Sequence, residues 1–322
     1  MKLWQEVILI FIVWYTSSCI ATTSTKVILK RNILETQELL IIQLLLSVMY
    51  LKLFQAAGIF NLTISSKHVQ NLKLHFLTMS TVYVIGFLLL QTALQMVSVS
   101  FAVTARGAEP AITCFFGLVF LSENITNIQW IAVLLIAVGI SFCTGSDKSW
   151  TVPGLLVLVI CDICFSTRSL IVKFMHKRTN DLNLERLSGQ KIYYVTCIIG
   201  SALMIAFSFG KFLVVGTTST STAIQHYSIQ IKNNLPILAA NSACFLLYNA
   251  SSYILLGKIQ LSYHAIGNSV RQVFVISFSM IVFQGSTLTP GNIFGIICVA
   301  CGAACYSIFK KDGAWYGIKR GQ

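Results

Sequence analysis

The chain is a succession of long apolar segments separated by shorter polar ones. The apolar runs are continuous over about twenty residues rather than alternating, so they predict membrane-spanning helices rather than strands. We therefore expect an all-α polytopic membrane protein with about ten transmembrane helices. In chain order the predicted spans are Trp4–Thr25, Thr36–Phe54, His75–Leu94, Ser98–Leu121, Ile128–Cys143, Thr151–Met175, Ile192–Phe209, Leu235–Leu256, Ser262–Phe283 and Gly291–Ile308. The longer connections are expected at Gln55–Leu74, His176–Lys191 and Gly210–Asn234.

The fourth span carries a charged residue, Arg106, well inside its apolar stretch. An arginine at such a depth costs about 2.5 kcal/mol or more, so it normally faces a partner or an aqueous cavity. Pro110 has no amide proton for the carbonyl oxygen of Arg106, and we expect the helix to bend there. Glu109 follows Arg106 by one helical turn and is placed to pair with its guanidinium group.

The ninth span carries a second deep arginine, Arg271, with no acidic residue three or four positions away. Tyr263 and Gly267 share its helix face, and His264 and Asn268 lie beside that face. Hydrogen-bond donors around a cation suit a phosphate or a carboxylate. A glycine on this face lets a ligand or a neighbouring helix approach closely.

The fourth and ninth spans also resemble one another. Aligning Ser100 with Ser262 places Arg271 opposite Glu109, one helical turn beyond the counterpart of Arg106. The fifth and tenth spans that follow are both rich in Ala, Gly, Ile and Val. This similarity predicts a duplicated architecture in which each half contributes one intramembrane arginine.

An odd number of spans in each half inserts the two halves in opposite orientations. We predict a first five-helix repeat at 1–146, a second and inverted one at 147–309, and a basic cytosolic tail at 310–322. With both termini in the cytosol, fourteen Lys and Arg residues lie on the cytosolic side and six on the other, which favours this orientation. A glycan on the sequons at Asn61 or Asn124 would reverse it.

Composition excludes several classes of protein. The chain is 56% hydrophobic and only 10% charged, which is not the composition of a soluble enzyme. Its net charge of +13 comes largely from short loops, where Lys and Arg orient membrane proteins, so nucleic acid is not an expected partner. None of the common hydrolase, metalloprotease or nucleotide-binding motifs occurs, and we predict no catalytic residues, no metal and no cofactor.

A third deep arginine, Arg168, lies late in the sixth span. Lys173 follows five residues later at the predicted cytosolic edge, so Arg168 is near that edge. Besides substrate binding, Arg168 has two structural roles open to it. It either extends toward the cytosolic edge or pairs with Asp162 on the same helix.

Several of these stretches resemble one transporter group. The segment Val99–Pro110 looks like VSFTHxIKxxEP of the triose-phosphate translocator and nucleotide-sugar transporter families of the drug/metabolite transporter superfamily, with Arg106 where a lysine is usual. Phe165–Lys173 is similar to that group's FxxRNxxxKK, and Ser262–Arg271 to SxxTxSVGNxVKR. Thr25–Lys26 loosely matches an Asn-Lys pair in the first span, and the resemblance covers nearly the entire chain.

The resemblance implies ten helices, strict exchange and alternating access. In these families the fourth-span lysine and a ninth-span Lys-Arg pair hold the phosphate, which implies that Arg106 and Arg271 are phosphate ligands here. Gln272 stands where the family has arginine, and Thr25 where it has asparagine. A site with one fewer cation is expected to prefer a different anion from triose phosphate.

We therefore expect an antiporter that exchanges a phosphorylated sugar or a nucleotide sugar for a phosphate-bearing counter-substrate, in the Golgi or endoplasmic reticulum membrane. Besides the two arginines, the candidates for substrate contact are polar residues of the matching segments: Tyr263, His264, Asn268, Arg168 and Lys26. Glu109 and Gly267 are the candidates for gating or ion pairing, with Glu109 holding Arg106 when the site is empty.

Two other functions stay open. A facilitator of neutral or amine metabolites would need no paired cations, and a membrane interaction protein that kept the fold would transport nothing. The expected partners are an organophosphate small molecule and the lipid bilayer, and a homodimer stays open as the state of assembly.

Overall fold

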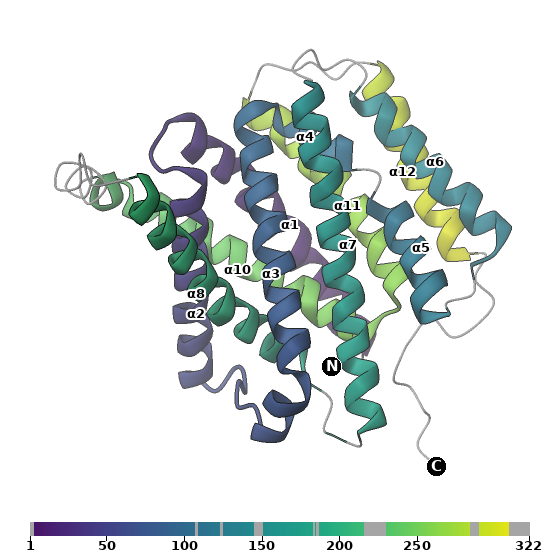
Figure 1. The fold of residues 1–322 in the computed structure, drawn as a ribbon. Coiled ribbons are helices and arrows are strands. Elements are labelled where there is room, and N and C mark those ends of the chain that lie inside the picture. The colour runs from purple at the N-terminus through teal and green to yellow at the C-terminus, as the bar shows by residue number, and fades with distance from the viewer. Residues whose placement is uncertain are drawn as a thin grey trace.

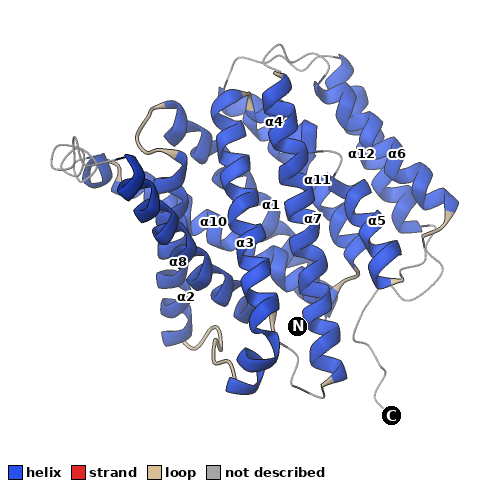
Figure 2. Cartoon of the chain, in the orientation of Figure 1, coloured by secondary structure: helices blue, strands red, loops and turns tan. Residues whose placement is uncertain are grey.

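The structure is a computed structural model that describes residues 3–106, 109–122, 125–144, 151–182, 184, 187–215, 230–283 and 290–308. The described residues form α-helices joined by short connections (Figure 2). The helices are α1 Leu3–Lys30, α2 Thr36–Ala56, α3 Ser66–Met96, α4 Val99–Ala105, α5 Glu109–Leu121, α6 Asn127–Thr144, α7 Val152–Asp181, α8 Gly189–Val215, α10 Leu235–Lys258, α11 Leu261–Phe283 and α12 Pro290–Ile308.

Each predicted span coincides with a helix or, for the fourth, with the pair α4 and α5. The predicted connection Gln55–Leu74 is too long, because α3 already begins at Ser66. Likewise α7 continues through Asp181 and α8 through Val215, into segments predicted as connections. These helices extend because polar residues continue a helix as readily as apolar ones, so hydropathy locates the apolar core of a span better than its ends.

Six of the described helices are long and apolar enough to cross a membrane: α1, α2, α3, α7, α8 and α11. Shorter apolar helices occupy Ala111–Leu121 and Asn127–Gly139. The protein is a polytopic α-helical membrane protein, and the count of ten spans stays a prediction. The predicted cytosolic tail, 310–322, and the sequon at Asn124 lie outside the described residues.

Local chemistry explains where several helices begin. The hydroxyl of Thr151 accepts a hydrogen bond from the amide of Gly154 at 3.2 Å and caps the start of α7. Glu35 and Glu38 form a capping box before α2, with the Glu35 amide 2.9 Å from the Glu38 carboxylate. Pro290 is the first residue of α12, where its missing amide proton costs no intrahelical bond.

Helices from the two predicted halves pack against each other in matched pairs. In the centre α3 lies along α7, and α1 lies along α10 (Figure 1). At opposite edges of the molecule α2 lies along α8, and α6 along α12 (Figure 1). In the predicted halves, α3 and α10 are the third helices and α1 and α7 are the first. Each central pair therefore joins the third helix of one half to the first helix of the other. Each edge pair joins helices that hold the same position in their halves.

The exterior of the bundle is apolar and the interior contains charges. Large aliphatic side chains remain exposed on the outer faces, including Ile131 at 64%, Leu156 at 58% and Ile281 at 74%. Arg106 and Arg271 are instead 5% and 3% exposed. This distribution is the one expected of a protein surrounded by lipid, in which charged groups face the bundle interior.

A candidate anion site between two buried arginines

The fourth predicted span, in which we expect a bend at Pro110, is described as two helices. Helix α4 ends at Ala105 and α5 begins at Glu109, with Arg106 at the junction. The main-chain carbonyl of Arg106 accepts a hydrogen bond from the side-chain amide of Gln272 on α11 at 3.3 Å. Since proline cannot bond this carbonyl, the interruption frees an acceptor that α11 then occupies. The break therefore ties α11 to the point where the first arginine is held.

Two carboxylates hold the Arg106 guanidinium group. Its terminal nitrogen donates to Glu109 Oε2 at 2.6 Å, which confirms the predicted pair. Its Nε donates to Asp162 Oδ1 on α7 at 3.0 Å. The interpretation that paired Asp162 with Arg168 is therefore wrong, because Asp162 faces α4 and α5 rather than the later turns of its own helix. The ring of Phe165 lies 4.7 Å from the Arg106 guanidinium carbon and covers the group.

Neutral groups surround the Arg271 guanidinium. Its Nε donates to Asn268 Oδ1 at 2.8 Å, and a terminal nitrogen donates to the hydroxyl of Ser18 on α1. The Tyr248 ring of α10 lies 5.2 Å from the guanidinium carbon. Within the described part of the chain, no carboxylate lies within 4.0 Å of this arginine. Arg271 is thus a buried cation held by dipoles and a ring face, not by a counter-charge.

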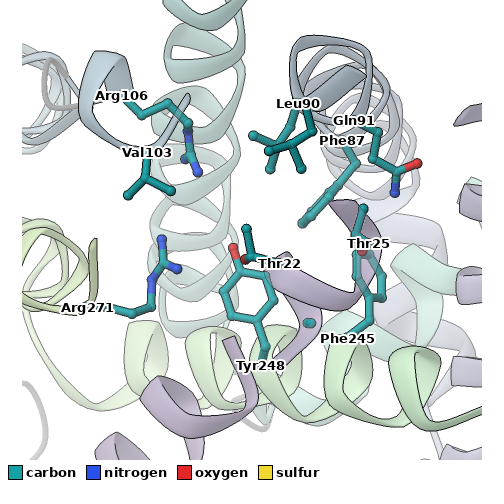
Figure 3. A pocket seen from close by; sticks show the side chains of 12 residues that line it. Thr22, Thr25, Phe87, Leu90, Gln91, Val103, Arg106, Phe245, Tyr248 and Arg271 are labelled. Carbon is teal, nitrogen blue, oxygen red and sulfur yellow. The ribbon is translucent and has the colours of Figure 1, made fainter. Parts of the chain in front are cut away.

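The two guanidinium groups line the same pocket. Figure 3 shows Arg106 above Arg271 at the left of the view, with their guanidinium ends toward one another and with Thr22 of α1 and Tyr248 of α10 nearby. The cavity volume is about 30 Å³. Because a water molecule needs about 10–15 Å³ measured in this way, the pocket holds about two waters. A sugar phosphate enters only after the surrounding helices or side chains move apart.

A carboxamide network next to this pocket was missed by the sequence reasoning. Gln91 of α3 lines the pocket and donates to Gln43 Oε1 at 2.7 Å. Gln43 of α2 donates to Asn241 of α10 at 2.8 Å, and Asn241 donates to Thr25 of α1 at 3.0 Å. The signal was present in the sequence, since amides inside apolar segments are costly unless they bond one another or a ligand.

Lys26 lies near the pocket but makes a structural contact. Its ammonium group donates to the carbonyls of Leu94 and Val97, at 2.8 Å for Val97, where α3 ends. Lys173 of α7 does the same at the end of α10, where it donates to the carbonyl of Ile259. A cation at a helix C-terminus stabilises the last carbonyls. In the alignment of Ser100 with Ser262, Val97 falls opposite Ile259, so the two lysines cap equivalent helix ends.

The other predicted contact residues of α11 do not line this pocket in the described structure. The ring of His264 stacks on Trp14 with centroids 5.0 Å apart, and its Nε2 lies 3.0 Å from the Ser252 hydroxyl. The Tyr263 ring packs edge-on against Tyr306 at 5.9 Å. Both residues lie about two turns along α11 from Arg271, so sharing a helix with Arg271 does not bring them to the pocket.

Gly267 and Arg168 also lie apart from the pocket. The carbonyl of Gly267 accepts a hydrogen bond from Tyr15 of α1 at 2.8 Å, and an added Cβ would lie 3.0 Å from the Phe11 ring. This glycine thus lets α1 approach, as predicted for a neighbouring helix. The Arg168 guanidinium carbon lies between aromatic rings, 5.4 Å from Phe165 and 5.2 Å from Tyr253. A substrate contact by either residue stays a prediction.

Comparison with known sequences identifies the family of this chain. A sequence model of the Triose-phosphate Transporter family matches residues 5–307. The chain belongs to this family. Members of the family are transporters rather than enzymes.

Three characterised relatives show what such proteins carry. Phosphoenolpyruvate/phosphate translocator 1 of Arabidopsis thaliana, a chloroplastic protein, is 25% identical over 73% of this chain and 55% of its own length. The triose phosphate/phosphate translocator of non-green plastids of Brassica oleracea var. botrytis is 24% identical over 73% of this chain and 56% of its own. Glucose-6-phosphate/phosphate translocator 2 of Arabidopsis thaliana is 23% identical over 71% and 57%. The matched region is thus little more than half of each relative.

A solved structure gives the fold independently. One crystal structure superposes on this chain with a TM-score of 0.58 at 11% identity, covering 94% of this chain and 99% of the other. At this level of identity the match concerns the helical arrangement and not the ligand.

Proposed function

We propose that the protein is a secondary antiporter that exchanges a phosphorylated metabolite for a phosphate-bearing counter-substrate. The observation that carries this proposal is the convergence of Arg106 and Arg271 on one buried pocket from opposite halves of the chain. Guanidinium groups bind phosphate through paired, charge-assisted hydrogen bonds. Arg271 is the principal anion ligand in this proposal, because no described carboxylate competes for it.

The substrate class follows from the relatives and from the amides near the pocket. The three relatives carry phosphoenolpyruvate, triose phosphate or glucose 6-phosphate in exchange for phosphate. A sugar phosphate is therefore the first substrate to test, and a nucleotide sugar the second. Gln272 places an amide beside Arg106, and the carboxamide network around Gln91 offers hydrogen-bond partners for the hydroxyls of a sugar.

The transport mechanism in this proposal is alternating access between two inverted repeats, 1–146 and 147–309. Two features support it: the helix pairs that interchange when the halves are exchanged, and the lysine caps at equivalent helix ends. A substrate that engages both arginines bridges the repeats and favours the states in which the halves close around it. Because the pocket admits about two waters, the structure corresponds to a closed state that must open at one end.

Counterflow in proteoliposomes tests the function. Purified protein is reconstituted with internal phosphate, and uptake of labelled glucose 6-phosphate, phosphoenolpyruvate, triose phosphate and a nucleotide sugar is measured. We expect exchange-dependent uptake that Arg271→Ala abolishes and Arg271→Lys partly retains, because lysine keeps the charge without the paired donors. Arg178→Ala, which replaces an exposed arginine at the end of α7, is the matched control and is expected to transport normally.

The alternatives have distinct outcomes in the same assay. Uptake that does not depend on internal phosphate and is not inhibited by it would favour a facilitator of neutral or amine metabolites. Absence of transport, together with a melting temperature that no organophosphate raises, would favour an interaction protein without transport. Unchanged exchange in Arg271→Ala would remove this arginine from the site.

The membrane and the orientation are separate proposals. From the sequence we predict the Golgi or endoplasmic reticulum with both termini cytosolic, whereas the three relatives are chloroplastic proteins. Fractionation of the tagged protein against Golgi, reticulum and plastid markers decides the membrane. Protease protection of terminal epitopes decides the orientation. A glycan on Asn61, which is exposed between α2 and α3, would reverse it.

A further inference from the structure

Two carboxylates behind the pocket already balance the charge of the two arginines that line it. Arg106 and Arg271 line the pocket, and Glu109 and Asp162 bond the first of them. A phosphate dianion bound between the arginines would add negative charge to these four groups, which are balanced among themselves. Buried charge without compensation is strongly unfavourable in a low-dielectric interior.

Asp162 is the carboxylate with the least compensation. It is 0% exposed, and only its Oδ1 bonds Arg106. Its Oδ2 has no hydrogen-bond partner in the described structure, although the carboxyl group lies near the Glu109 amide. A buried carboxylate oxygen without a partner is stabilised when it binds a proton.

The surroundings offer no other base for that proton. On α7 itself the thiol of Cys161 donates to the carbonyl of Gly86 on α3, and α3 presents the Phe87 ring beside it. From α10 the phenol of Tyr248 lies near Arg106, and α11 contributes the cation Arg271. Around the two carboxylates, the described side chains are thus cations, neutral donors or rings.

We infer that the Asp162–Glu109 carboxylate pair takes up a proton when the phosphate group of a substrate enters the pocket, so that substrate and proton cross the membrane together. The inference rests on the proposed function and adds a transported ion to it. The proton comes from water on the side of entry, binds a carboxylate oxygen, and returns to water when the substrate leaves. Protonation weakens the hold of the carboxylates on Arg106 and frees its donors for the phosphate.

Isothermal titration calorimetry with inorganic phosphate tests the inference directly. Binding to the purified full-length protein is measured at pH 8 in buffers that differ in their enthalpy of ionisation, which gives the number of protons taken up. We expect about one proton per bound phosphate in the wild type. We expect none in Asp162→Asn, whose neutral amide replaces the protonated acid. Asp181→Asn, which replaces an exposed residue at the end of α7, is the control and keeps the wild-type value.

Each outcome is decisive. Binding without proton uptake in the wild type overturns the inference and leaves the proposed function intact. Equal uptake in the wild type, Asp162→Asn and Glu109→Gln places the proton on the phosphate and also overturns it. If neither phosphate nor any organophosphate binds, the proposed function fails and the inference with it. If Asp162→Asn does not fold, the inference is tested by the number of protons taken up by the wild type and by Glu109→Gln.

The same linkage has a readout in transport. In proteoliposomes loaded with phosphate, an inwardly directed proton gradient is expected to accelerate the exchange uptake of labelled phosphate by the wild type and to have no effect in Asp162→Asn. Uptake by the wild type that ignores the gradient contradicts the inference.

Discussion

Arg106 and Arg271 are alike in residue type and burial, but their surroundings differ in kind. Arg106 is held by two carboxylates and lies at a helix interruption. Arg271 lies inside a continuous helix and is held by an amide, a hydroxyl and aromatic rings. The first half thus neutralises its own cation, whereas the second half keeps a cation available. A transporter built from two similar halves therefore has an electrically asymmetric site.

The largest effect is expected on stability, when the two arginines are removed in turn. Arg106→Ala leaves Glu109 and Asp162 buried without their counter-ion, which costs about 3–5 kcal/mol of unfolding free energy. Arg271→Ala orphans no charge and is expected to cost much less. Equilibrium denaturation in mixed micelles measures both variants. Equal losses would show that the carboxylates are satisfied without Arg106 and that the two arginines do not differ in this way.

An intermediate effect is expected from adding a third cation beside the pocket. Gln272→Arg keeps a donor for the Arg106 carbonyl and adds a positive charge beside the pocket. A charge-assisted hydrogen bond to phosphate is expected to tighten binding by about tenfold. It is also expected to reduce proton uptake on binding, since the added cation replaces the proton. Calorimetry at pH 8 measures both quantities.

Gln272→Met is the control for that substitution, because it removes the amide without adding charge. Wild-type affinity in Gln272→Arg would show that the position does not contact the anion. Tighter binding in both variants would assign the effect to loss of the amide instead.

The smallest effect on stability is expected when the lysine caps are removed. In each half we expect this effect at a different helix end. Lys26→Met removes a cation from the end of α3, and Lys173→Met removes one from the end of α10. Each contact at a helix C-terminus is worth about 0.3–1 kcal/mol, so amide exchange near the affected end is expected to rise about two- to fivefold. Hydrogen–deuterium exchange by mass spectrometry measures each end separately. A rise at both ends in either variant would show that the caps do not act locally.

The helices and the first ion pair could be predicted because they depend on neighbours along the chain. Glu109 lies one turn from Arg106, and Pro110 follows at the position that should donate to the Arg106 carbonyl. Helical geometry relates such positions whatever the rest of the fold does. For the same reason, the order of residues alone shows that Arg271 has no acidic neighbour on its own helix face.

The partners that lie far apart along the chain required the tertiary structure. Asp162 is 56 positions from Arg106 and Ser18 is 253 from Arg271, so spacing along a helix says nothing about either contact. Periodicity placed Tyr263 and His264 on or beside the helix face of Arg271, but they lie about two turns along α11 from it and pack against Tyr306 and Trp14. The positions of the charges, of the proline in the fourth span and of the apolar spans are determined by the amino-acid sequence alone. Which carboxylate reaches which arginine depends on how the helices rotate and tilt as they pack, because side-chain packing between helices sets those angles.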